Sequence, residues 1–148
     1  MQQFIQSRRI GNVITFLALI IVLSLSSCSR KVTFPPSAAV PAASGWALVK
    51  STDTNYAVKI RIDNLAPPQN LVPPQDVYIV WVDTESDGIK RLGSIQSSSG
   101  FLSKALKASL DATIPFKPTR IMITAESEPD PAYPSMYTVL RTGVISVR

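Results

Sequence analysis

The sequence contains no histidine and only one cysteine, Cys28. Histidine is the side chain whose ordinary pKa lies nearest neutral pH, and it is the commonest metal ligand. Its absence excludes Ser-His-Asp and Cys-His catalysis and any histidine-ligated metal site. One cysteine cannot form a disulfide within the chain, so a folded domain must be stabilised by an apolar core. We predict no catalytic residue and no cofactor.

Charge of one sign is not in large excess either. The 148 residues carry 15 Lys and Arg against 10 Asp and Glu, a formal net charge of +5. Nucleic-acid-binding domains usually gather their cations in one patch, whereas these are spread along the chain. We therefore interpret them as a solvated surface and predict no nucleic-acid partner. The cations of the middle region are Lys50, Lys59, Arg61, Lys90, Arg91, Lys104 and Lys107.

The N-terminal stretch has the three parts of a secretory signal peptide. Residues 1–12 contain Arg8 and Arg9 and no acid, and residues 13–25 form an apolar run of 13 residues. A helix that spans a bilayer needs roughly 20 apolar residues, so this run is short for a membrane span. A transmembrane signal anchor with a structural cysteine is the alternative interpretation.

The run ends in Leu25-Ser26-Ser27-Cys28, which resembles the bacterial lipobox. The resemblance implies cleavage between Ser27 and Cys28, loss of residues 1–27, and acyl chains such as palmitate on Cys28. Two or three chains would anchor the protein stably, because each buried methylene contributes about 0.8 kcal/mol. Ser29 follows the cysteine in place of aspartate, which by the enterobacterial sorting rule implies an outer-membrane address facing the periplasm.

Residues 28–44 are predicted to be the lipidated cysteine and a flexible tether. Segment 29–44 is rich in Pro, Ala and Ser and has little apolar periodicity, so it cannot bury enough surface to offset its ordering entropy. An extended linker of this kind would hold the domain roughly 30–50 Å from the lipid. Arg30 and Lys31 would be attracted by anionic headgroups beside the anchor.

Residues 45–148 are predicted to form one domain of short strands separated by turns rich in Pro, Gly, Ser and Asp. Val58, Ile60 and Ile62 alternate with charged residues, which is the period of a half-buried strand. Residues 77–82 are apolar at every position, which is typical of a central strand with both faces covered. The expected strands are 46–49, 56–65, 77–82, 89–95, 106–112, 120–126 and 137–147.

Seven short strands at close spacing predict an all-β fold, a small antiparallel immunoglobulin-like β-sandwich. Residues 101–112 fit a helix or a strand, and their Ser and Thr content favours a strand over 106–112. Trp81 is expected to take the place of the core tryptophan of such sandwiches. Gly143 predicts a bulge or kink in the last strand.

A combination of short motifs also runs through the domain, and its four parts are Tyr78-Ile79-Val80-Trp81-Val82, Leu92-Gly93, Ile121-Met122-Ile123-Thr124-Ala125-Glu126 and Pro134-Ser135. Over about residues 56–145 the combination resembles the extracytoplasmic domain of anti-sigma-K-type factors. The resemblance implies a sensor-like or partner-binding sandwich outside the cytoplasm. Those factors carry a sigma-binding segment and a transmembrane helix before this domain. The sequence shows neither, so we do not expect sigma binding.

Two acidic stretches are candidates for a metal site. Residues 83–88 match the start of a calcium-loop pattern, but the twelfth position is Ser94 instead of Glu, so the bidentate ligand is missing. Glu126, Glu128 and Asp130 could join them only if the two loops meet. We favour a hairpin turn with solvated acids and predict no metal. Catalysis by paired carboxylates would need an apolar pocket that the sequence does not indicate.

A partner surface is predicted from strand 77–82 and from the loop before the last strand. If Trp81 faces the core, every second residue beside it faces outward, and a soluble domain should not leave such an apolar stripe uncovered. The loop carries Tyr133 and Tyr137, which are typical interface anchors, although packing over one end of the sandwich is the simpler explanation. The predicted surface comprises Tyr78, Val80, Val82, Tyr133 and Tyr137.

The sequence as a whole favours a non-enzymatic lipoprotein of the cell envelope that acts as a binding or accessory module. Its expected partners are the membrane, through the lipid on Cys28, and a protein of the envelope. A regulatory subunit that signals across the membrane through such a partner is one alternative. A carbohydrate-binding module or a small hydrolase is another.

Overall fold

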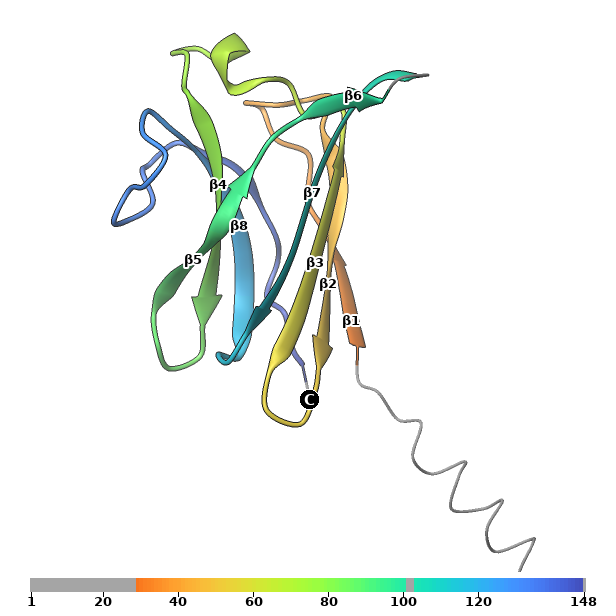
Figure 1. Cartoon of the computed structure of the whole chain (residues 1–148), viewed down its shortest axis with the longest axis vertical. Helices are drawn as coiled ribbons and strands as arrows, with labels where there is room; N and C mark the ends of the chain where they lie inside the picture. The colour runs from red at the N-terminus through yellow and green to blue at the C-terminus, as the bar shows by residue number, and fades with distance from the viewer. Residues whose placement is uncertain (1–28, 101–102, 148) are drawn as a thin grey trace, which may run out of the picture.

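Two antiparallel sheets face each other in the computed structural model, which describes residues 29–100 and 103–147 (Figure 1). Sheet A has the strand order β1-β2-β3-β7-β6, and sheet B has the order β5-β4-β8-β9. The elements are β1 (Ser29–Thr33), β2 (Ser44–Ser51), β3 (Tyr56–Asp63), the 3-10 turn η1 (Pro68–Asn70), β4 (Val77–Thr84), β5 (Ile89–Ile95), β6 (Ser98–Gly100), β7 (Ser103–Ile114), β8 (Pro118–Glu126) and β9 (Thr138–Arg141).

The predicted all-β, antiparallel, immunoglobulin-like sandwich is confirmed. Strands β2-β3-β7-β6 follow the A-B-E-D order of such domains, and β5-β4-β8-β9 follow the order C′-C-F-G. The seven expected strands correspond to β2, β3, β4, β5, β7, β8 and β9. The ambiguous segment is a strand from Ser103 onward. The described residues add two strands that the sequence did not indicate, β1 and the short β6.

The core lies between the sheets and is filled by alternate residues of each strand. In β3, Val58, Ile60 and Ile62 have at most 1% of their surface exposed. Lys59 and Arg61 between them point to the outer face of sheet A, because successive side chains of a strand project to opposite faces. Burying each of these aliphatic side chains contributes roughly 1.5–3 kcal/mol to the stability of the fold.

The flexible tether predicted for residues 29–44 is wrong. Its first part forms β1, which pairs with β2 along its whole length. Phe34, Val40 and Ala43 are buried members of the core. The strand hydrogen bonds and this buried surface offset the ordering entropy that the Pro- and Ala-rich composition suggested would prevail. The domain therefore includes residues 29–44, which the sequence had placed outside it. The predicted signal peptide, its cleavage and Cys28 lie outside the described residues.

The faces of β4 are reversed from the prediction. The residues fully buried between the sheets are Tyr78, Val80 and Val82. Ile79 and Trp81 point the other way and form a second cluster with Met122 on the outer face of sheet B. The prediction that Tyr78, Val80 and Val82 form an outward-facing partner surface is therefore wrong. Trp81 lies on the strand that carries the core tryptophan of immunoglobulin domains, but it is not that residue's counterpart.

The last strand is shorter than predicted. β9 ends at Arg141, just before Gly143, so the glycine lies beyond the strand instead of forming a bulge within it. Residues 142–147 continue beside β8 through backbone hydrogen bonds to the carbonyls of Ile121 and Thr119. The segment thus extends the contact of the chain's end with sheet B.

Candidate interaction surfaces

A buried polar network lies beside the Trp81 cluster on the outer face of sheet B. Trp81 Nε1 donates to Thr124 Oγ1 at 2.8 Å, and the Thr124 hydroxyl donates to Glu126 Oε1. The same carboxylate oxygen accepts the Ser135 backbone N–H at 3.0 Å. Glu126 is only 5% exposed, so its carboxyl group is enclosed among these donors. The network connects the sheet to the loop that follows β8.

That loop, residues 127–137, has a second attachment to sheet B. Arg91 of β5 donates to the Pro129 carbonyl at 2.8 Å and pairs with Asp130 at 2.8 Å. Arg91 stands opposite Trp81 in the β4–β5 register. Only 2% of the surface of Trp81 is exposed. The outer face of sheet B is therefore joined to a loop of the same chain instead of being a free apolar face.

The network unites residues from the motifs of the anti-sigma-K resemblance. Trp81 comes from the first motif, Thr124 and Glu126 from the third, and Ser135 from the fourth. Gly93 of the second motif has φ +153 and lies where the β4–β5 register shifts. The motif residues thus hold strands and a loop together. Their spacing along the sequence gave no sign that they would meet.

The acidic stretches of the sequence are separated in the structure. Asp83 pairs with Arg120 at 3.9 Å, and Glu85 pairs with Lys117 at 3.1 Å. Residues 85–88 form the β4–β5 hairpin turn that we favoured over a calcium loop. Within the part of the chain that the structure describes, no group of three Asp, Glu, Cys or His residues could hold a metal ion.

The two loop tyrosines of the predicted partner surface differ. Tyr133 is 83% exposed. Tyr137 packs against the core and donates its hydroxyl to the Val72 carbonyl at 3.0 Å. This bond joins loop 127–137 to the β3–β4 loop. Val72 in the β3–β4 loop is 90% exposed, and Met136, the residue before Tyr137, is fully exposed. Tyr133, Met136 and Val72 are the apolar tips of these two loops.

An open cavity of about 290 Å³ lies where β4 begins and β5 ends. Tyr78 is the one ionisable phenol among the described residues that line it, and the Tyr78 hydroxyl donates to the Ala66 carbonyl at 2.8 Å. Burial, together with the nearby Tyr137, raises the pKa of Tyr78 to about 12. Its phenol is therefore neutral and hydrogen-bonded at neutral pH, which suits a structural role. The cavity is lined by Pro67, Pro68, Gln69, Asp76, Val77, Tyr78, Ile95, Gln96 and Ser97.

The outer face of sheet A gathers cations that lie far apart in the sequence. Directly paired residues of antiparallel strands project to the same face. One such row is Lys31, Leu48, Lys59 and Asp111, and the next contains Trp46 and Arg61. We call this surface the basic face; its cations are Lys31, Lys50, Lys59, Arg61 and Lys107. The interpretation of the cations as scattered is corrected, because strand pairing collects five of them.

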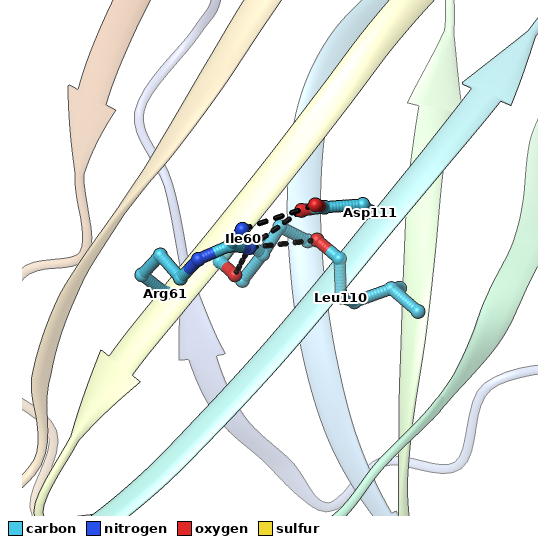
Figure 2. A network of polar contacts seen from close by, with 4 residues as sticks. All are labelled: Ile60, Arg61, Leu110 and Asp111. Carbon is cyan, nitrogen blue, oxygen red and sulfur yellow. Dashed lines mark hydrogen bonds and ion pairs between the residues drawn. The ribbon is translucent and has the colours of Figure 1, made fainter.

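Figure 2 shows the ion pair of the basic face. The two guanidinium nitrogens of Arg61 donate to the two carboxylate oxygens of Asp111 at 2.5 and 3.0 Å, and one also donates to the Ile60 carbonyl at 2.7 Å. The hydrogen bond from Arg61 holds the pKa of Asp111 below its ordinary value, and the same bond raises the pKa of Arg61. Asp111 thus remains ionised and neutralises one of the five cations.

A tryptophan lies among these cations. Trp46 is half-buried, and the Lys31 ammonium stands 4.4 Å from the centre of its ring. Such a cation–π contact is weak at an exposed site, so the ring remains available for other contacts. Asp63 and Asp111 are the carboxylates of this face. The basic face therefore combines five cations, two acids and a partly exposed indole.

Comparisons with protein-family models, with curated proteins and with solved structures found no match. The class that the fold defines is an immunoglobulin-type sandwich, and the likeness to anti-sigma-K-type domains stays a prediction based on motifs. None of the described residues belongs to a helix long and apolar enough to cross a membrane.

Proposed function

We propose that the chain is a lipoprotein of the bacterial cell envelope whose sandwich is a non-enzymatic binding module. The observation that carries the proposal is the Leu25-Ser26-Ser27-Cys28 stretch, which ends a short apolar run and immediately precedes the first strand. Cleavage before Cys28 and acylation of its sulfur would attach the sandwich to a membrane. We place the anchor in the outer membrane, with the domain in the periplasm.

The arrangement of the sandwich ends supports a role in binding a second protein. Ser29 stands opposite Lys50 at one end of sheet A, whereas Ser44 stands opposite Asp63 at the other end. The β3–β4 loop that carries Val72 follows Asp63, so it lies at the end away from the anchor (Figure 1). The apolar tips would therefore lie at the end of the sandwich opposite the anchor, where an envelope protein could reach them.

Acylation is tested on the full chain produced in a bacterial host that processes lipoproteins. We expect the N-terminal peptide of the membrane-bound protein to begin at Cys28 and to carry the mass of its acyl chains. A Cys28→Ser variant should lack this modification, and an inhibitor of the lipoprotein signal peptidase should leave the leader attached. A wild-type peptide that retains residues before Cys28, or a free thiol, would contradict the proposal.

Partner binding is tested by site-specific photocrosslinking in intact cells. A crosslinking residue at Tyr133 should give a discrete adduct, and the same residue at Thr54, in the turn at the opposite end, serves as the matched control. The adduct at position 133 should disappear when Val72 and Met136 are both changed to Ser. Glycan binding or substrate turnover by the purified protein, without an adduct, would favour the carbohydrate-binding or hydrolase alternative.

A further inference from the structure

We propose that the basic face of sheet A lies against anionic lipid headgroups of the membrane that holds the anchor. The inference rests on the acylation of Cys28 proposed above. It adds an orientation to that attachment, because it names the surface of the sandwich that contacts the bilayer. The chemistry that would be recognised is the phosphate charge of a lipid such as phosphatidylglycerol.

The first argument is the distance between the anchor and the fold. Ser29 is the first residue of β1, and consecutive Cα atoms are about 3.8 Å apart. Acyl chains on Cys28 would therefore hold β1 directly at the lipid surface, without the stand-off that a tether would give. Since β1 is the edge strand of sheet A, this sheet is the part of the sandwich brought to the membrane first.

The second argument is the order of the charges along the strands. Lys50 lies opposite Ser29, in the row nearest the anchor. Lys31 and Lys59 share the next row, and Arg61 lies in the row after that. Successive rows on one face are about 7 Å apart, so most of the cations fall within roughly 15 Å of the anchored end. Lys50, Lys31 and Lys59, in the two rows nearest the anchor, lie within about one Debye length of that end, roughly 8–10 Å, so their attraction to headgroups is only partly screened.

The third argument is charge and side-chain complementarity. The basic face has five cations against two carboxylates, and Lys31, Lys50, Lys59 and Lys107 take part in none of the ion pairs found among the described residues. On the outer face of sheet B, by contrast, two of the three arginines, Arg91 and Arg120, are each paired with an aspartate, and Arg141 is the third. The half-buried Trp46 is of the residue type enriched at membrane–water interfaces.

The test uses the purified acylated protein in two kinds of vesicle, phosphatidylcholine alone and phosphatidylcholine mixed with phosphatidylglycerol. Lysines are labelled with an amine-acylating reagent and quantified by mass spectrometry, which also reads the acyl chains on the N-terminal peptide. Each cation near an anionic surface gains about a five-fold preference for it. We expect labelling of Lys31, Lys50 and Lys59 to fall at least about three-fold in the anionic vesicles.

Two lysines that lie away from the basic face serve as internal references. Lys90 and Lys117 should be labelled equally in the two vesicles. Added salt should restore the labelling of the protected lysines, because it screens the attraction. A second readout is quenching of Trp46 by bromine-labelled lipid, to which Trp81 is insensitive because it is buried. Lys59→Gln with Lys107→Gln should reduce this quenching at least about two-fold, and Lys90→Gln with Lys117→Gln should not.

Several results would overturn the inference. If the N-terminal peptide carries acyl chains but lysine labelling is unchanged, the proposed acylation of Cys28 is supported and the contact of the basic face with lipid is rejected. Equal protection of Lys90 and Lys117 would mean that the sandwich stands on its end. Protection in intact cells but not in anionic vesicles would mean that a protein or polysaccharide covers the basic face. Absence of the acyl chains would reject both the inference and the proposed function.

Discussion

Each sheet of the sandwich carries one tryptophan on its outer face, Trp46 on sheet A and Trp81 on sheet B. Trp81 is 2% exposed, donates its indole N–H to Thr124, and lies on the sheet to which loop 127–137 is attached. Trp46 is half-buried and has the Lys31 ammonium over its ring. The difference shows that an apolar side chain outside the main core can either stabilise the fold, as Trp81 does, or form part of an exposed surface, as Trp46 does. What distinguishes Trp81 is its burial and its hydrogen bond to another strand of the same sheet.

The strongest test of this comparison is a pair of matched substitutions. Trp81→Ala should lower the free energy of unfolding by about 3–5 kcal/mol, because it empties a buried site and removes the indole donor to the Thr124 hydroxyl. Trp46→Ala should cost about 1 kcal/mol or less, because the ring is only half-buried. Equilibrium urea unfolding measures both values. Equal losses would show that the two faces do not differ as described.

The burial of Tyr78 on the inner face of β4 can be tested by the pH dependence of stability. Tyr78 faces the core, and its pKa is raised to about 12 in the fold, against about 10 in the unfolded chain. The resulting stability is complete below pH 10. It should fall by roughly 2–3 kcal/mol as pH rises from about 10 to 12, because only the unfolded chain ionises there. Tyr78→Phe should remove this part of the alkaline loss. If the variant and the wild type lose stability equally, the buried phenol is not responsible.

The attachment of loop 127–137 to sheet B is tested at Glu126. Glu126→Ala removes the acceptor of the Thr124 hydroxyl and the Ser135 N–H, and should cost about 1–3 kcal/mol. Amide exchange at Ser135 should become faster in the same variant. Glu128→Ala, at an exposed position of the same loop, is the control and should change neither quantity. Unchanged exchange in Glu126→Ala would mean that other contacts hold the loop.

The smallest expected effect on stability comes from the ion pairs of the two faces. Asp111→Asn and Asp130→Asn each remove the carboxylate partner of one arginine and raise the net charge by one. Both pairs are exposed, so the free energy of unfolding should hardly change. Only Asp111→Asn should increase the quenching of Trp46 in anionic vesicles, because it frees Arg61 on the basic face. If quenching of Trp46 increased equally in both variants, membrane binding would depend on net charge and not on the basic face.

The strands of the domain were predictable because their pattern is local. In β3, the alternation of Val58, Ile60 and Ile62 with charged residues fixes both the strand and its buried side. In β4 the same rule fails, since no polar residue between Val77 and Val82 marks either face. The size of Trp81 suggested a core position. The structure instead places Tyr78 inside and satisfies the Trp81 indole outside, a solution that depends on a threonine 43 residues away.

Other features depended on pairing that a single sequence does not reveal. The segment that forms β1 precedes a Pro- and Ala-rich stretch, and it becomes a strand because β2 offers it an edge. The basic face was missed for a related reason. Lys59 and Arg61 share a face by spacing alone, but their meeting with Lys31 and Lys107 depends on the register of four strands. Composition could describe the charges only as scattered.

The position of β1 also determines how the fold would bear mechanical load. Tension on a chain held at Cys28 would enter the sandwich at Ser29 and act along the axis of an edge strand. The hydrogen bonds between β1 and β2 run across that axis, so a pull from the far end would strain them together in shear instead of opening them one by one. In a protein fixed to a membrane at one end and to a partner at the other, the hydrogen bonds along the whole of β1 would share the load.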